Sequence, residues 1–367
     1  MLLSYILNHY LKTTIRINYG KTDFSKPDRQ GVGRVSVACV SSLNGRREGV
    51  SDESYRKIWQ VAVENGYSPR GMQALHSPGA HRNYVGIVQR SGLKIDQPSN
   101  TFSHVRQGLF KVFQQSRIST TFLGGEGDLD EKKLFELLGQ RDPLQGIVVF
   151  GEVNPTFLKG LSALRVALLN VYASAPGLCH SVTPNEKQAL EQIVEYLVGL
   201  GHERFAWLGG NSTLGRHEMQ LNALRDCLLV RGLKLDEQFV VSVEKADRQE
   251  GFDCANELMI RVGGKNSEAP TAWICHNGLM ARGAHQFALL RGIRIPGDIS
   301  LAAVDRTRVC TEIHPDLTSA SSDPEVIGME AAKLLCKSEA PGENLIPVDL
   351  VVPSEFSIGE TSGPAAK

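Results

Sequence analysis

The chain has 367 residues, 41% of them hydrophobic and 22% charged, a globular composition long enough for two or three compact units. No run of about 18 uncharged apolar residues occurs, which excludes a membrane-spanning helix. The formal net charge of zero hides an asymmetry: residues 1–83 hold 12 Lys/Arg against 6 Asp/Glu, as expected of a polyanion-binding module fused to a different domain, although chance clustering would also produce it.

The first 34 residues do not predict a regular domain start. The segment MLLSYILNHYLK lacks the basic beginning of a secretory signal, so we expect a cytoplasmic protein. Leu3, Ile6, Leu7 and Tyr10 fall at helical spacing, which makes residues 2–12 a candidate helix.

Two short helices are predicted next. VSVACVSSLNG at 35–45 indicates a helix with Ser36 as N-cap and Gly45 as its end. A second helix follows Ser51 and ends at Asn65–Gly66, with an apolar stripe of Tyr55, Ile58, Trp59, Ala62 and Val63. Because short helices with one apolar stripe are not stable alone, they must belong to a small helical bundle.

The polar segment HSPGAHRN at 76–83 marks a boundary, after which β-rich runs alternate with helical stretches. Helices are expected through Val105, Leu109, Val112 and Phe113, at 134–139 and at 186–201, the last stopped by Gly201. Buried strands are expected at 84–88, 119–125, 146–151, 165–171, 204–210, 238–243, 271–277 and 300–305. Such a series predicts parallel strands covered on both faces, and its length favours two similar α/β subdomains facing each other across a cleft.

Catalytic and metal-binding motifs are missing from the sequence. Seven scattered cysteines form no CxxC pair and indicate reduced, buried thiols. No GxGxxG, P-loop, GxSxG or HExxH occurs. We therefore expect neither an enzyme nor a cofactor or metal.

Several motifs in order resemble the LacI/GalR family of bacterial transcription regulators. They are VSVACVSSLNG (35–45), VSDESYRKI (50–58), NGYSP (65–69), SNTFSHVRQGL (99–109), GHERFAWLGG (201–210), PTAWICHNGLMARGA (270–284), GIRIPGDISLAAVDR (292–306) and HPDLTSASSDPEVIGMEAAKLL (314–335). The resemblance implies a small all-α helix-turn-helix head and an α/β periplasmic-binding-protein-like body of two parallel-sheet subdomains. We assign residues 35–68 to the head, 69–83 to a hinge or linker and 84–362 to effector binding and dimerisation.

The family's first head helix corresponds to residues 24–33. Here that stretch is FSKPDRQGVG, whose Pro27, Gly31 and Gly33 are unfavourable inside a helix. Residues 1–34 are therefore either an atypical extension or a substitute first helix.

In this family the second helix of the head enters the DNA major groove, and a hinge helix wedges into the minor groove. The resemblance assigns base contacts to Val37 and Ala38, a base or phosphate contact to Ser42, and phosphate contacts to Ser36, Ser41, Asn44 and Tyr55. Met72 and Leu75 are the candidates for the wedge, although Leu75 lies one place before the family's Leu position, which His76 occupies here.

The resemblance also implies an effector site at strand ends between the subdomains. Arg216, Asn277 and Asp305 match positions that hold a small polar ligand, and Phe102 matches a ring that stacks on a sugar. Capping is the alternative role for Asp305, and core packing for Phe102.

We therefore expect a ligand-responsive regulator, a homodimer that binds double-stranded operator DNA and senses a sugar or related polar metabolite, with no membrane partner. The alternative is a cytoplasmic small-molecule-binding protein that has lost DNA recognition.

Overall fold

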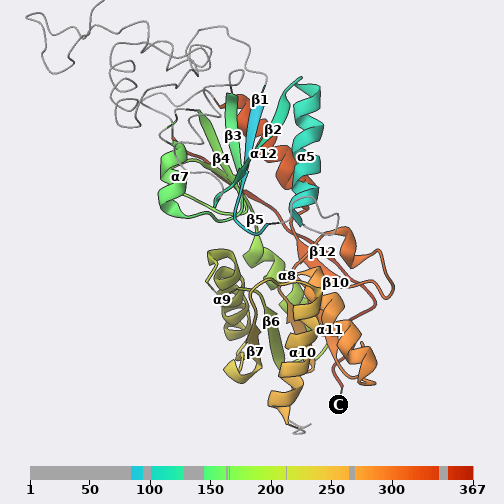
Figure 1. Ribbon diagram of the computed structural model, residues 1–367. Coiled ribbons are helices and arrows are strands. Elements are labelled where there is room, and N and C mark those ends of the chain that lie inside the picture. Colours follow the sequence, from blue (N-terminus) through green and yellow to red (C-terminus); the bar gives the residue numbers. More distant parts are fainter. Residues whose placement is uncertain are drawn as a thin grey trace, which may run out of the picture. The chain divides into compact units, whose positions relative to one another are not determined.

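The computed structural model describes residues 84–93, 101–127, 144–162, 164, 166–211, 213–263, 269–338 and 346–366. These residues form two six-stranded sheets, ordered β11-β5-β4-β3-β1-β2 and β12-β10-β9-β8-β6-β7 (Figure 1). All neighbouring strands are parallel except the antiparallel pair β10 and β12. The body therefore has the predicted α/β architecture, whereas the predicted helical head lies outside the described residues.

We call the first sheet and its helices the N lobe. Its strands are β1 (Tyr84–Gln89), β2 (Ser119–Gly125), β3 (Leu144–Phe150), β4 (Ala167–Val171), β5 (His180–Pro184) and β11 (Asp349–Val352). Its helices are α5 (Thr101–Gln115), α7 (Pro155–Ser162) and α12 (Pro324–Lys337). Helices α5 and α12 pack on one side of the sheet and α7 lies on the other (Figure 1).

The second sheet and its helices form the C lobe. Its strands are β6 (Phe205–Gly209), β7 (Val240–Ser242), β8 (Ala272–Cys275), β9 (Ser300–Ala303), β10 (Thr318–Ser321) and β12 (Glu355–Ser357). Its helices are α8 (Glu186–Gly199), α9 (Gly215–Val230), α10 (Arg248–Val262) and α11 (Gly278–Leu290).

The central strands β6 and β8 of the C lobe are apolar along their length because both faces of the sheet are covered. On β6, Phe205 and Trp207 pack into a core with α8 and α9. The alternate residues Ala206 and Leu208 pack into the opposite core with α10 and α11. The uninterrupted apolar runs in the sequence thus correspond to a three-layer lobe.

Glycines bring two helix pairs into close contact. A methyl group added at Gly251 or Gly283 would lie within 3 Å of the backbone of the facing helix, which joins α10 to α11. In the same way, a methyl group at Gly108 of α5 or Gly328 of α12 would lie within 3 Å of the backbone of the other helix. These four positions therefore exclude any larger side chain without a shift of the helices.

The chain crosses between the lobes three times, at 184–186, 321–324 and 352–355. Ser322, fully buried, joins all three crossings: its Oγ accepts from the Asn185 N–H (3.1 Å) and donates to the Val352 carbonyl (2.6 Å). The Asn185 N–H also contacts the Val352 carbonyl at 3.0 Å. One hydroxyl group thus ties together the segments about which the lobes would rotate.

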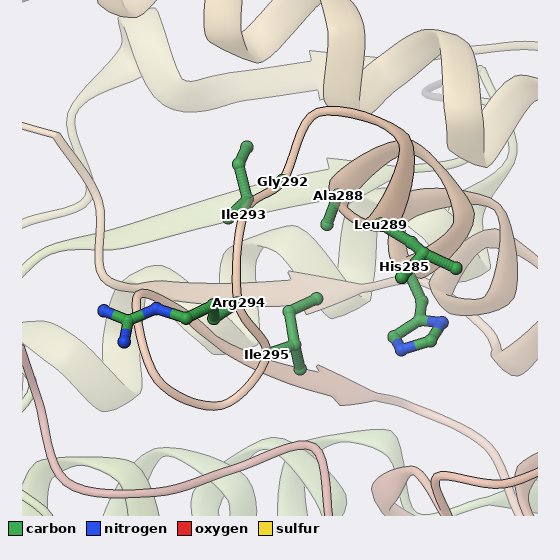
Figure 2. Close-up of a pocket in the computed structure, with 7 residues that line it drawn as sticks. All are labelled: His285, Ala288, Leu289, Gly292, Ile293, Arg294 and Ile295. Carbon is green, nitrogen blue, oxygen red and sulfur yellow. The ribbon is translucent and has the colours of Figure 1, made fainter.

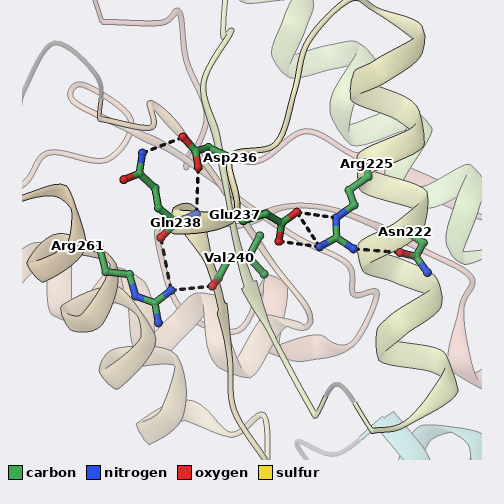
Figure 3. Close-up of polar contacts among 7 residues, drawn as sticks. All are labelled: Asn222, Arg225, Asp236, Glu237, Gln238, Val240 and Arg261. Atoms are coloured by element: carbon green, nitrogen blue, oxygen red, sulfur yellow. Dashed lines mark hydrogen bonds and ion pairs between the residues drawn. The ribbon is translucent and has the colours of Figure 1, made fainter.

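Strand β7 is an edge strand, and charged side chains cover it (Figure 3). Arg261 of α10 donates to the Val240 carbonyl at 2.9 Å. Arg225 of α9 makes a bidentate pair with Glu237, its Nη2 lying 2.9 and 2.8 Å from the two carboxylate oxygens. Arg261 occupies a backbone acceptor that another strand would otherwise use.

The predicted strands form close to their expected bounds, and α8 ends before Gly201, which has a φ of +87°. One prediction is corrected: residues 237–239 form a 3-10 turn instead of the start of a strand, because the Asp236 side chain accepts from the Gln238 N–H. The helix predicted at 134–139 lies outside the described residues.

Six cysteines lie in the described residues, all of them free thiols and five of them buried, as the sequence predicted; Cys39 lies outside. Burial raises the pKa of Cys254 to about 12, so this thiol stays protonated. Within the described part of the chain, no helix is long and apolar enough to cross a bilayer.

Candidate functional site

Arg216 lies in the first turn of α9 and pairs with the carboxylate that begins α8. Its Nε is 2.5 Å from Glu186 Oε1, and the Glu186 side chain is only 1% exposed. The second carboxylate oxygen accepts from Gln220 Nε2 at 2.6 Å. Three side chains from two helices therefore form one buried network.

Two histidines extend this network. Gln220 presents its Oε1 to His276 at the end of β8, so His276 Nδ1 donates at 2.5 Å. The His276 ring lies against that of His217, with ring centroids 3.7 Å apart. We call Arg216, Glu186, Gln220, His276 and His217 the Arg216 cluster.

The histidines of the cluster are neutral at pH 7. Burial lowers the pKa of His276 well below its ordinary value. Burial and the nearby charges of Arg216 and Arg90 lower the pKa of His217 to about 3.

The charge of Arg216 is balanced inside the cluster. Burial acts to lower its pKa, but Glu186 and other nearby groups outweigh burial and raise it, so the guanidinium stays ionised. With both histidines neutral, the Arg216 cluster carries no net charge. It offers hydrogen-bond donors and acceptors without an uncompensated charge to attract an ion.

The N lobe contributes aromatic rings beside this cluster. The Tyr172 ring, immediately after β4, lies 4.9 Å from Arg216 Cζ. Phe102 packs against Tyr172 and Phe150, with ring centroids 5.3 and 5.9 Å apart. The structure thus brings two predicted site residues, Phe102 and Arg216, into contact with the same ring, that of Tyr172.

Asn277 and Asp305 are fully engaged in contacts within the C lobe. Asn277 is the N-cap of α11, accepting from Met280 N and donating to the Ala246 carbonyl, each at 2.9 Å. The Asp305 oxygens accept from Gly278 N at 2.7 Å and Thr307 N at 2.5 Å. These contacts all go to backbone groups, and the role of both side chains toward an effector stays a prediction.

Sequence reasoning missed Glu186, Gln220, His217, His276 and Tyr172. Glu186 was visible only as an acidic residue in the first turn of a helix. His276 lies in the segment TAWICHN, beside the residue that was selected. No sequence signal indicated that His217 would meet it.

All residues predicted to contact DNA lie outside the described residues. They are Ser36, Val37, Ala38, Ser41, Ser42, Asn44, Tyr55, Met72 and Leu75.

A separate pocket of about 280 Å³ lies at the end of α11, lined by His285, Ala288, Leu289, Gly292, Ile293, Arg294 and Ile295 (Figure 2). The Arg294 side chain extends away from the other lining residues and is paired with Asp298 at 2.5 Å. With few convergent polar groups, this pocket is less suited to a polar ligand than the Arg216 cluster.

One group of possible metal ligands occurs among the described residues, formed by His314, Asp316 and Glu360 within 4.8 Å of one another. Glu360 Oε2 already lies 3.1 Å from His314 Nδ1 and accepts from Asp316 N at 2.9 Å. These contacts tie the C-terminal segment to the loop before β10, and we assign no ion to them.

Known proteins share this architecture. A family model described as a periplasmic binding protein-like domain matches residues 194–362. The HTH-type transcriptional regulator DegA of Bacillus subtilis is 22% identical over 340 residues, covering 90% of this chain and 95% of DegA. The catabolite control protein A of Staphylococcus epidermidis is 24% identical over 309 residues, covering 83% of this chain and 89% of that protein.

Two solved structures show the same fold. The transcriptional regulator CelR in complex with cellobiose has a TM-score of 0.65 at 20% identity, covering 89% of this chain and 100% of that chain. The lac repressor dimer bound to operator and the anti-inducer ONPF has a TM-score of 0.65 at 19% identity, covering 90% of this chain and 96% of that chain.

Proposed function

We propose that this chain belongs to the LacI/GalR family of transcription regulators and is a ligand-responsive regulator that binds operator DNA. The observation that carries the proposal is the extent of the match to DegA. It covers 90% of the chain, whereas residues 84–367 make up less than four fifths of it. The relationship to a helix-turn-helix regulator must therefore extend into the basic segment before residue 84.

In this proposal residues 35–68 bind the major groove and residues 69–83 connect the head to the body. A homodimer places two heads on the half-sites of a pseudo-palindromic operator. The excess of Lys/Arg in residues 1–83 supports attraction to phosphate groups.

The proposed effector is a sugar or a related uncharged polar molecule. The Arg216 cluster supports this, because its charge is already balanced and its histidines are neutral. An anionic ligand would have to compete with Glu186 for Arg216. A neutral hydroxyl group would place no second negative charge beside Glu186, and the Phe102 and Tyr172 rings suit the apolar face of a sugar.

In this proposal, ligand binding changes DNA affinity by changing the relative position of the two lobes. A ligand that prefers one relative position of the lobes shifts the population toward it, and in this proposal that movement changes the spacing of the two heads.

DNA binding is tested by incubating the purified full-length protein with fragmented genomic DNA of the organism that encodes it and sequencing what is retained. We expect enrichment of a sequence with two-fold symmetry that is lost steeply with added salt. Ala38→Glu should abolish enrichment, because it places a carboxylate on the predicted recognition helix. Ala366→Glu, the same change at an exposed site in the body, should not.

Ligand binding is tested by thermal shift with a panel of neutral sugars and the corresponding sugar phosphates. We expect a neutral sugar to raise the melting temperature and its phosphate to have a smaller effect. Arg216→Leu should remove the shift, while Arg225→Leu, on the same helix in an exposed pair, should keep it. A ligand-induced shift without enrichment of any DNA fragment would identify the alternative, a small-molecule-binding protein without DNA recognition.

A further inference from the structure

Two N-lobe side chains contact the first turn of α9, which belongs to the C lobe. Glu152, directly after Gly151 at the end of β3, accepts from the Gly215 N–H through Oε2 at 2.8 Å. Tyr172, directly after the neighbouring strand β4, lies under the guanidinium of Arg216. Adjacent strand ends of one lobe thus contact consecutive residues of the other.

The N-terminus of α9 differs from those of the other C-lobe helices with a described cap. Helices α8, α10 and α11 are capped by Asn185, Asp247 and Asn277, each from the segment directly before its helix. Leu214, which precedes α9, makes no side-chain cap. The carboxylate of Glu152 fills that role from the opposite lobe, where the helix dipole favours an anion.

Tyr172 adopts a backbone conformation that a bulky residue rarely takes, with φ of +69°. Its N–H donates to the Val182 carbonyl at 3.0 Å, and its ring contacts both Phe102 and Arg216. An unfavourable conformation persists only where the surroundings enforce it, and it is common where position matters for function.

We propose that Glu152 and Tyr172 are positioning residues that form a latch between the lobes. The latch holds the first turn of α9, and therefore Arg216, in a fixed position relative to the N lobe. Separation of the lobes would leave the amide of Gly215 without its carboxylate acceptor and the Arg216 guanidinium without its aromatic neighbour. A role of the latch in the response to a ligand rests on the proposed function. The latch contacts themselves do not depend on that function.

Hydrogen–deuterium exchange of the full-length protein tests the latch at Gly215. Glu152→Ala should accelerate exchange in the peptide spanning the start of α9 by about tenfold, since a charge-assisted hydrogen bond is lost. The matched control is Glu126→Ala, which removes a carboxylate that accepts from Asn154 N at 2.6 Å within the N lobe and should leave α9 unchanged. Equal exchange at α9 in the wild type and Glu152→Ala would overturn the proposal.

Small-angle X-ray scattering supplies a readout that a purely local role would not change. Glu152→Ala and Tyr172→Ala should increase the radius of gyration, whereas Glu126→Ala and Tyr172→Phe, which keep the latch contacts, should not. If Tyr172→Ala fails to fold, Glu152→Ala still decides the question, and an unchanged radius in that variant contradicts a latch. Both measurements use neither DNA nor ligand, so the latch and the regulatory function can fail separately.

Discussion

At the scale of single residues, Glu186 balances the charge of Arg216 in the candidate site. It is almost fully buried, and both of its oxygens are used, one by Arg216 and one by Gln220. Removing one member of a buried ion pair leaves the other charge without compensation, which costs far more than the loss of an exposed pair.

Glu186→Ala should therefore lower the free energy of unfolding by about 3–5 kcal/mol, measured by urea denaturation. The control is Glu237→Ala, which breaks the exposed pair with Arg225 and should cost less than about 1 kcal/mol. A loss below about 1 kcal/mol in Glu186→Ala would show that Arg216 finds another partner or solvent, and that the cluster is not a closed network.

The predicted site residues Arg216, Asn277 and Asp305 turned out differently in the structure. Arg216 was predicted by the family resemblance together with its place beyond an apolar strand, and the structure puts it in a buried polar cluster. Asn277 and Asp305 were predicted by the same logic, yet their side chains satisfy backbone N–H groups at the start of α11 and in the loop after β9. A polar residue between a strand and the following helix can cap that helix or contact a ligand. The sequence pattern alone does not separate these two roles.

At the scale of elements, the glycine pairs determine how closely helices approach. Gly283→Ala should destabilise the protein by about 1–3 kcal/mol, because its methyl group would meet the backbone of α10. Gly199→Ala, in the last turn of α8 with open space around it, should instead stabilise by about 0.5–1 kcal/mol. Opposite signs in chemical denaturation are the expected result, and a neutral Gly283→Ala would mean that α10 and α11 separate easily.

The crossings between the lobes depend on one hydroxyl group. Ser322→Ala should lower the free energy of unfolding by about 0.5–1.5 kcal/mol, because the Asn185 N–H and the Val352 carbonyl keep their direct contact but lose the shared hydroxyl group. Differential scanning calorimetry checks this loss. Ser338→Ala is a matched control, since its hydroxyl donates only to the Leu334 carbonyl at the end of α12.

The strands that the sequence predicted are those with long apolar runs. Strands β5, β10, β11 and β12 were not predicted because they are short and contain Ser, Thr, Pro or charged residues. Their pairing is set by the three crossings, which bring distant parts of the chain to the edges of both sheets. The hydrophobic pattern within a short segment contains no information on such long-range contacts. The pairing of these four strands therefore could not be predicted from the sequence.

At the scale of the whole molecule, buried histidines make stability depend on pH. Burial lowers the pKa of His180, His202, His217, His276 and His285 in the folded state. The unfolded chain therefore binds more protons below pH about 6.5, and the free energy of unfolding falls as the pH drops from there toward about 3, the pKa of His217.

Urea midpoints measured at pH 7.5, 6 and 5 should decrease in that order. His276→Gln should flatten the dependence, because one buried neutral histidine is removed. His314→Gln should not flatten it, since this exposed residue has a raised pKa that arises from Glu360 and Asp316 and contributes with the opposite sign. Stability that is constant between pH 7.5 and 5 would contradict the buried, neutral state of these side chains.

The most direct test of the whole account is a fluorescence anisotropy titration of the enriched DNA fragment, with and without the sugar that raises the melting temperature. A coupling of 1–3 kcal/mol between the two sites corresponds to a change of about 5- to 150-fold in DNA affinity, and we expect the wild type to fall in that range. Arg216→Leu should bind the fragment with an affinity that the sugar does not alter. A dissociation constant for DNA that stays the same at saturating sugar in the wild type would contradict a ligand-responsive regulator.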